Sequence, residues 1–187
     1  MKLDDSPSSI YAEISCFALS KDKKIIAAGT SQINAKILIW DICSRTCFKQ
    51  LALSNSSHIQ AIKFAYDNRH IIVLALTNHY DLMLYLIDTL YSLILGCTYF
   101  PYSVPFKIKD LEMFPNSIYE FVTCGVQHIA EWSLKGSILS YNNMEIENPK
   151  GLVELVKEDG AIVDLNILKV DFITVIFVNE TIITAGD

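Results

Sequence analysis

The sequence predicts an all-β protein built from a repeated set of short strands. Apolar segments of about six residues alternate with polar turns, and no stretch shows the 3.6-residue apolar period of an amphipathic helix. Similar segments return at intervals of 45, 49 and 64 residues. The 187 residues suit one domain with a sizeable core. With 51% apolar and 19% charged residues, the composition is that of a globular chain and excludes a disordered one.

The first strand of each repeat is predicted from four apolar segments, each followed by a turn. The turns read SKDKK, AYDNRH, FPNSIYE and VNE, and their Asp, Asn, Ser and Pro residues favour chain reversal. The four strands are expected at residues 14–19, 59–64, 108–113 and 172–177.

A second strand follows each of these turns. The four segments read IIAAG from residue 25, IIVLAL from residue 71, FVTCG from residue 121 and TIITAG from residue 181. Three of them contain a glycine at the end, where a missing side chain permits close sheet packing and a sharp reversal. The pattern therefore predicts repeated hairpins.

Third and fourth strands complete three of the repeats. The third strands read KILIWD (36–41), LMLYLID (82–88) and HIAEWS (128–133). Each leads through a short turn into a fourth strand, which begins near Cys47, Leu93 and Ile138. Each full repeat is thus predicted to contain four strands.

The ends of the third strands resemble WD repeats. Trp40 and Asp41 form the signature dipeptide in the first repeat. The second repeat retains only the aspartate of this dipeptide, Asp88, and the third retains only the tryptophan, Trp132. Positions 41, 88 and 133 are 47 and 45 residues apart, close to the family period of about 40–45 residues. The resemblance covers roughly residues 10–187. It implies a β-propeller of four-stranded blades in which these four residues are structural.

The repeats depart from the WD pattern at two places. The Gly-His pair that usually precedes the first strand is reduced to Ser57-His58, so that the resemblance implies a structural role for His58. The usual Asp between the second and third strands is mostly missing. The blades are therefore degenerate copies.

The expected organisation is one partial propeller domain over residues 1–187. It contains about three and a half blades, and it is not closed because closed rings have about four to eight. We expect a further chain or further blades to complete the ring. The alternative is a truncated or split fragment of a longer WD-repeat protein with no independent function. The expected parts are blade one at about 10–53, blade two at about 57–99, blade three at about 106–141, an insertion at about 142–171 and a half blade at 172–187.

A more specific resemblance lies in blade three. The segment EFVTCGVQHIAEWSLKG, from Glu120, is similar to a stretch of echinoderm microtubule-associated-protein-like and cilia- and flagella-associated WD-repeat proteins. That resemblance implies protein partners of an axonemal or microtubule-associated assembly, and a place in the cytoplasm, at the cilium or the cytoskeleton.

The sequence contains no recognisable catalytic or metal-binding motif. The five cysteines lack the paired spacing of a zinc or redox site, and no phosphate-loop, nucleophile-elbow or dinucleotide-binding motif is present. We expect no catalytic residue, no metal and no cofactor, and hence no enzyme.

Charge and hydropathy exclude two further classes of partner. The chain has 15 basic and 21 acidic residues, and the net charge of −6 argues against a nucleic-acid surface. The longest apolar stretch, 82–100, contains Asp88 and many β-forming residues, which favours two strands over a membrane-spanning helix. The first five residues do not resemble a secretory signal, which predicts a cytosolic protein.

The predicted function is therefore a non-catalytic scaffold for protein–protein interaction. Turn residues between strands are the candidates for contact, and Tyr80, Tyr99, Phe100 and Tyr102 would form an aromatic patch among them. Packing of these rings against their own blade is the alternative. The candidate interaction residues are Gln32, Asn34, His58, Asn78, His79, Tyr80, Tyr99 and Tyr102.

Overall fold

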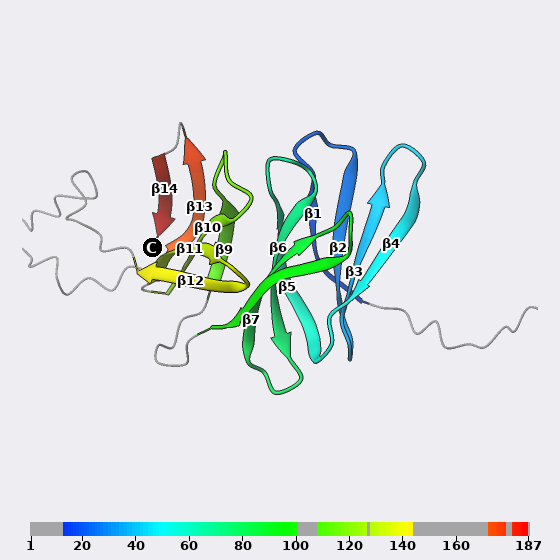
Figure 1. The fold of residues 1–187 in the computed structure, drawn as a ribbon, viewed down its shortest axis with the longest axis horizontal. Helices are drawn as coiled ribbons and strands as arrows, with labels where there is room; N and C mark the ends of the chain where they lie inside the picture. The colour runs from blue at the N-terminus through cyan, green and yellow to red at the C-terminus, as the bar shows by residue number, and fades with distance from the viewer. Residues whose placement is uncertain (1–12, 101–107, 127, 144–171, 179–180, 187) are drawn as a thin grey trace, which may run out of the picture.

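The computed structural model describes residues 13–100, 108–126, 128–143, 172–178 and 181–186 (Figure 1). These ranges contain fourteen β-strands, and none of their residues is helical. No helix in the described part of the chain has the length and hydropathy to cross a membrane. The predicted all-β class is confirmed.

The strands form three four-stranded units, called blades here, and one further hairpin. Blade 1 contains β1 (Glu13–Leu19), β2 (Ile25–Ser31), β3 (Lys36–Asp41) and β4 (Thr46–Ala52). Blade 2 contains β5 (Ser56–Phe64), β6 (His70–Thr77), β7 (Leu82–Asp88) and β8 (Leu93–Tyr99). Blade 3 contains β9 (Ile108–Met113), β10 (Glu120–Gly125), β11 (His128–Lys135) and β12 (Ile138–Asn143). The hairpin pairs β13 (Phe172–Val178) with β14 (Thr181–Gly186).

Every neighbouring pair of strands within a blade is antiparallel and follows chain order. Blades 1 and 2 are joined into one eight-stranded sheet by a pairing between Ser31 and His58, whereas blade 3 is a separate sheet. All the predicted strands are present. The first strand of blade 2 starts three residues before the expected residue 59, and β12 runs on to Asn143. The rest of the predicted insertion, 144–171, lies outside the described residues.

The backbone repeats even where the residue types at the turns do not. In the β1–β2 and β5–β6 turns, Lys23 and Asn68 have positive φ angles of 60° and lie 45 residues apart. In the turns between third and fourth strands the same conformation recurs at positions 45, 92 and 136. Left-handed residues at matching places show that the first turn has the same geometry in blades 1 and 2, and that the turn between the third and fourth strands has the same geometry in all three blades.

The core consists of layers between successive blades. Side chains alternate across each strand, so that every blade has a leading face toward the blade before it and a trailing face toward the blade after it. The trailing face of blade 1 packs on the leading face of blade 2, and the trailing face of blade 2 packs on the leading face of blade 3. Val175 of β13 covers Val122 and Cys124 on the trailing face of blade 3. Blade 2 is therefore buried on both faces, which explains why β6 and β7 are almost continuously apolar.

A glycine sets the distance between blades 1 and 2. A Cβ atom added to Gly29 would lie 2.6 Å from Cγ2 of Ile59, closer than real side-chain contacts allow. The close packing predicted from the glycine at the end of the second strand is thus confirmed for blade 1.

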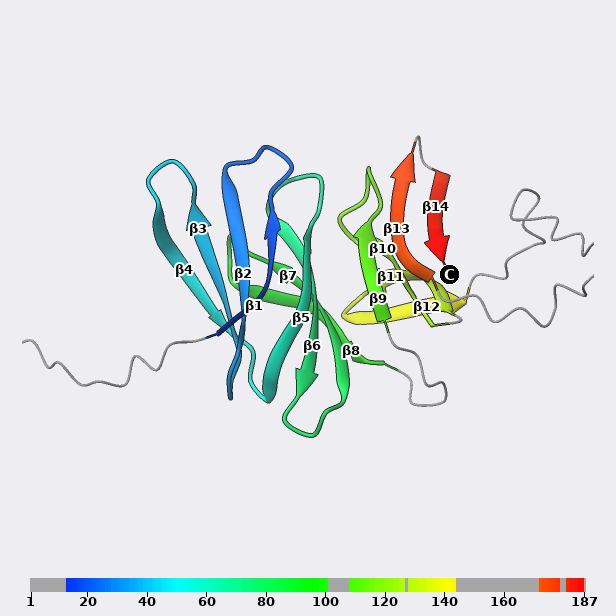
Figure 2. The ribbon, with the colours of Figure 1, turned by 180° about the vertical axis from the view of Figure 1, so that it is seen from behind.

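The units succeed one another along the molecule, with blade 1 at one end and the β13–β14 hairpin at the other (Figures 1 and 2). The arc is open because these two end units do not meet.

Candidate functional site

The turns of blades 1 and 2 form two opposite rims, because antiparallel strands in chain order reverse alternately at one end and at the other. The upper rim contains the turns near residues 20–24, 42–45 and 65–69, at the top of Figure 1, and the turn near residues 89–92, which is hydrogen-bonded to the 65–69 turn. The lower rim contains the turns near residues 32–35, 53–55 and 78–81. The candidate interaction residues of the described chain all lie in or beside the turns of the lower rim.

Backbone hydrogen bonds tie the turns of the lower rim together. The Ala35 amide donates to the Ser56 carbonyl at 2.8 Å, and the Asn78 amide donates to the Asn55 carbonyl at 2.8 Å. The segment between blades 1 and 2 therefore holds the β2–β3 turn on one side and the β6–β7 turn on the other. The two turns belong to a single, connected surface.

Tyr80 projects from this surface more than any other large apolar or aromatic residue described. The residue is 83% exposed, and its φ angle is 66°, a conformation that bulky residues rarely adopt. Asn34, the corresponding residue of blade 1, has a φ of 56°, and asparagine tolerates this region well. An exposed aromatic ring on a strained backbone contributes little to the fold, and such outliers are more common at functional sites.

The other described candidates are either exposed or half-buried. Asn78, His79 and Tyr99 are exposed, whereas His58 is half-buried in the pairing between β5 and β2. Gln32 and Asn34 lie in the β2–β3 turn beside Ile33, which the sequence analysis did not select and which is 79% exposed. Tyr102 lies outside the described residues.

The prediction of an exposed aromatic patch is wrong for one of its residues, Phe100. Phe100 is buried, and its ring centroid lies 5.4 Å from that of Trp132. Phe100 belongs to the core cluster between blades 2 and 3, and its amide donates a hydrogen bond to the Leu82 carbonyl at 2.8 Å, so that it continues the pairing of β8 with β7. Here the alternative of packing against the chain's own blades is the correct one.

The signature residues of the repeat are in unlike surroundings. Trp132 is fully buried, donates a hydrogen bond from Nε1 to Thr123 Oγ1 at 2.9 Å, and stacks on Phe121 with the rings 1° from parallel. Trp40 occupies the same position of blade 1 and is 37% exposed. Its pairing partner is Ile26, so that Ala28 stands where blade 3 has Thr123.

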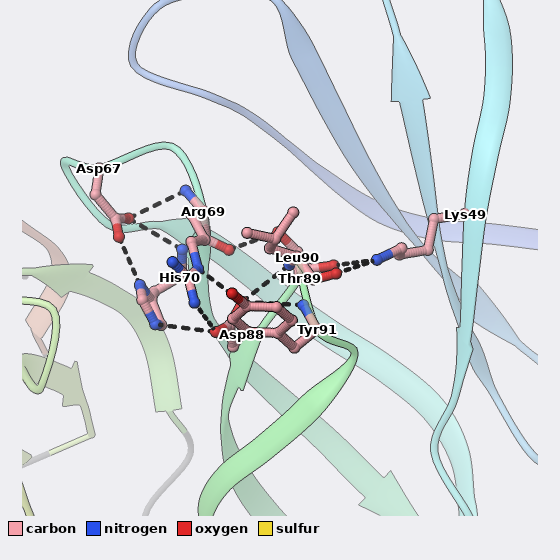
Figure 3. A network of polar contacts seen from close by, with 8 residues as sticks. All are labelled: Lys49, Asp67, Arg69, His70, Asp88, Thr89, Leu90 and Tyr91. Carbon is pink, nitrogen blue, oxygen red and sulfur yellow. Dashed lines mark hydrogen bonds and ion pairs between the residues drawn. The ribbon is translucent and has the colours of Figure 1, made fainter.

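A network of charged side chains holds the upper rim of blade 2 (Figure 3). Arg69 makes two hydrogen bonds to the carboxylate of Asp88, and its guanidinium lies 4.9 Å from the centre of the Tyr91 ring. His70 Nδ1 is 2.5 Å from Asp67 Oδ2, and its Nε2 is 3.8 Å from Asp88 Oδ2. The network therefore connects the β5–β6 turn to the β7–β8 turn.

The charged form of the central carboxylate is strongly favoured. The hydrogen bonds from Arg69 lower the pKa of Asp88 to about 2, and amides of Leu90 and Tyr91 act in the same direction. Burial raises the pKa of Asp67, but hydrogen bonds from His70 and from the Arg69 amide outweigh this, so that its pKa is also lowered. Both carboxylates accept hydrogen bonds as anions.

Blade 1 is attached to the same rim. Lys49 Nζ donates to the carbonyl oxygens of Thr89 and Leu90, each at 2.7 Å. Because the carboxylates are already engaged by Arg69, His70 and backbone amides, the arrangement serves to fix two turns and two blades. Asp88 thereby connects the β7–β8 turn to the β5–β6 turn.

Sequence reasoning identified Asp88 but missed Asp67, Arg69 and His70 as its partners. The signal that could have found them is the charged run DNRH at residues 67–70, where the second strand begins. The third strand of the same blade ends at Asp88, and antiparallel pairing brings its end beside the start of the second strand. In blade 1, Asp22 instead accepts a hydrogen bond from Ser20 and Asp41 accepts one from the Ser44 amide, each within its own turn.

The described part of the chain contains no group of three or more His, Cys, Asp or Glu side chains that could hold a metal ion. Among the cysteines, burial raises the pKa of Cys124 to about 11, and the thiol is therefore in its neutral form.

Solved structures with the same architecture are β-propellers of the WD40 type. The β-propeller domain of Cps50 (Swd1) from Myceliophteria thermophila matches 94% of this chain with a TM-score of 0.66 and 12% identity. A chain of a mitotic checkpoint complex matches 73% with a TM-score of 0.53 and 15% identity, and the WD40 repeats of RRP9 match 72% with a TM-score of 0.55 and 11% identity. The fold is thus an unclosed part of a WD40-type propeller.

The sequence itself has no such matches. No protein-family model and no curated protein matches it. This chain matches 51% of the Cps50 domain, 40% of the checkpoint-complex chain and 38% of the RRP9 domain. It therefore spans about half the length, or less, of the solved propellers that it resembles.

Proposed function

We propose that this protein is a non-catalytic scaffold that binds other proteins through the lower rim of blades 1 and 2. The observation that carries the proposal is Tyr80, which is held in a strained, exposed conformation on a turn that is otherwise fixed by hydrogen bonds. Aromatic residues are enriched in protein interfaces because they bury a large area at a low cost in conformational entropy. The WD40-type fold supports the same function.

The rim offers a mixed surface rather than a catalytic one. Tyr80, Ile33 and Tyr99 supply apolar area, while Asn34, Asn78 and His79 supply hydrogen-bonding groups around it. An apolar centre surrounded by polar groups is the usual composition of a protein-binding patch. We expect a folded protein partner rather than a small molecule.

We propose that the partner belongs to a cytoskeletal or axonemal assembly. The protein itself is then expected in the cytoplasm, at the cilium or the cytoskeleton. The support is the similarity of residues 120–136 to echinoderm microtubule-associated-protein-like and ciliary WD-repeat proteins. The net charge of −6 opposes direct attraction to an acidic polymer, so we propose contact with microtubules through another protein.

Affinity capture with a matched pair of rim variants tests this function. The immobilised chain is incubated with a detergent-extracted cytoskeletal fraction and, separately, with the soluble fraction. We expect proteins from the cytoskeletal fraction to bind the native chain and the Tyr66→Ser variant, whose ring lies on the upper rim, but not Tyr80→Ser. Equal capture by both variants, or capture from the soluble fraction alone, would contradict the proposal.

A further inference from the structure

The two rims of blades 1 and 2 differ in charge. The four turns of the upper rim contain five Lys or Arg residues and two Asp residues, whereas the three turns of the lower rim contain no Lys or Arg and one Asp. The chain as a whole has a net charge of −6. Positive charge is therefore concentrated on one rim of an acidic protein.

The turns of the upper rim form one connected surface. In blade 1 the Ile42 amide donates to the Lys24 carbonyl at 2.9 Å, and in blade 2 the Thr89 amide donates to the Arg69 carbonyl at 3.1 Å. Lys49 joins the two blades through its hydrogen bonds to the β7–β8 turn. Because the turns are fixed before any partner arrives, a ligand meets a preorganised surface, which lowers the entropy cost of binding.

Exposed apolar residues gather on the outer upper rim, which we define as residues 42–49 and 89–93. The β5–β6 turn with Tyr66 is not part of it. Five large apolar residues of the outer upper rim are between 38% and 71% exposed: Ile42, Phe48, Leu90, Tyr91 and Leu93. Single exposed apolar residues are normal, whereas groups of them mark interaction sites.

The carboxylates beside these residues are already engaged, while two cations are not. Asp41 accepts a hydrogen bond from the amide of Ser44, and Asp88 is held by Arg69 and by two backbone amides. Lys23 and Arg45 are exposed, and neither forms an ion pair with a residue that the structure describes. The charges available to a partner are therefore mainly positive.

Arg45 occupies a backbone position that favours glycine. The equivalent turn residues of the three blades are Arg45, Ser92 and Gly136, with φ angles of 57°, 58° and 67°. Glycine adopts this conformation at no steric cost, as blade 3 shows. Blade 1 instead has a long charged side chain there, and residues in sparsely populated conformations are more common at functional sites.

We propose that the outer upper rim binds a short acidic segment of a partner protein, in which carboxylate side chains alternate with large apolar ones. The guanidinium of Arg45 can donate two parallel hydrogen bonds to one carboxylate. Leu90 and its apolar neighbours require apolar groups, which the phosphate backbone of a nucleic acid does not supply.

The net charge of the chain also favours a short segment over a long polyanion. A charge of −6 repels a nucleic acid or an anionic membrane that extends along the whole molecule. A short segment contacts only this rim, and charges farther away than the Debye length of about 8 Å are largely screened. The protein would then hold two different partners, one at each rim.

Fluorescence anisotropy with a synthetic peptide tests this proposal on the full chain. The probe is a fluorescein-labelled peptide in which the sequence Glu-Glu-Leu-Phe is repeated twice. We expect a dissociation constant of about 10–100 µM, typical of a small interface. Such weak complexes are lost during the washing steps of affinity capture, so the Tyr80 experiment is independent of this one.

Two variants should weaken binding of the probe. Arg45→Glu places a negative charge opposite the carboxylates and should raise the dissociation constant at least about tenfold. Leu90→Ser removes apolar contact area and should raise it at least about fivefold. Both side chains are exposed, so far-ultraviolet circular dichroism should match that of the native chain.

Lys109→Glu is the matched control, because it reverses an exposed charge at the start of β9, away from the upper rim. This variant should bind the probe as the native chain does. A native chain that does not bind the probe, equal affinities of the native chain and Arg45→Glu, or equal binding of a Lys-Lys-Leu-Phe peptide would each overturn the proposal. Tighter binding of oligothymidylate or of phosphatidylserine vesicles than of the probe would also overturn it.

Discussion

Blades 1 and 3 carry a tryptophan at the same position of the third strand, and the two rings differ in burial. Trp132 is buried among Phe100, Phe121 and Tyr141 and is hydrogen-bonded to Thr123. Trp40 has a third of its surface exposed. Trp40 pairs with Ile26 as Trp132 pairs with Phe121, but the pairing of β3 with β4 has a register shift next to Trp40 that the pairing of β11 with β12 does not have.

The cover from the neighbouring blade differs as well. Trp132 faces the trailing side of blade 2 and shares a core cluster with Leu84 and Leu86, whereas no described blade stands before the leading face of blade 1. The contribution of a repeat residue to the free energy of unfolding therefore depends on how much of its side chain the adjacent blade buries. The same sequence signature stabilises different blades by different amounts.

The largest difference in stability is expected when each of the two tryptophans is replaced by alanine. Trp132→Ala removes a large buried ring and leaves a cavity, and we expect it to lower the free energy of unfolding by about 3–5 kcal/mol. Trp40→Ala should lower it by less than about 1.5 kcal/mol, because more than a third of this residue is already exposed. Urea denaturation monitored by circular dichroism gives both values, and equal losses would contradict the comparison.

The polar contacts of blades 1 and 2 allow a second test. Arg69→Met leaves the buried Asp88 carboxylate without its main partner and should lower the free energy of unfolding by roughly 3 kcal/mol. Lys24→Met in blade 1 removes an exposed pair with Asp22 at 3.9 Å and should change it by less than about 0.5 kcal/mol. Urea denaturation at neutral pH separates these outcomes.

Acid should weaken blade 2 through the same carboxylate. The pKa of Asp88 is about 2 in the folded protein against 3.8 for the free side chain, so its contribution is fully present above pH 4 and is lost as pH falls toward 2. The expected loss is about 2 kcal/mol. The unfolding free energy of Asp88→Asn should show a smaller decrease over this interval, and an identical pH profile for the two proteins would contradict the assigned role.

The smallest expected effect compares the lower-rim turns. Tyr80→Asn puts a residue that tolerates positive φ in place of a bulky one, and should raise the free energy of unfolding by about 0.5 kcal/mol. Asn34→Tyr makes the reverse change at the matching place and should lower it by a similar amount. Thermal unfolding of the two variants under the same conditions provides the measurement. Changes of the same sign would show that the two turns are not equivalent.

Most of the fold could be predicted from the sequence because each blade carries its own local signals. Polar turns and apolar strands of fixed spacing placed β3 and β7 at their observed bounds. The start of β5 was less accurate, since its first residues pair with β6 and β2 through backbone contacts that the apolar pattern does not reveal. Backbone pairing of polar residues leaves no periodic signal.

The candidate site was less predictable because exposure depends on neighbours far along the chain. Tyr80 and Phe100 look alike as aromatic residues near turns, yet one is exposed and the other is buried against Trp132. The partnership of Arg69 with Asp88 joins two turns 19 residues apart, and its strength comes from the burial of the carboxylate. Such pairs become visible only when the strands are placed in space.

The most direct test of unequal cover on equivalent faces is quenching of tryptophan fluorescence, because the chain has only two tryptophans. Trp40→Phe leaves Trp132 alone and Trp132→Phe leaves Trp40 alone. We expect blue-shifted emission and weak acrylamide quenching from Trp132, and red-shifted emission with several-fold stronger quenching from Trp40. Equal emission maxima and equal quenching constants would contradict the arrangement of blades described above.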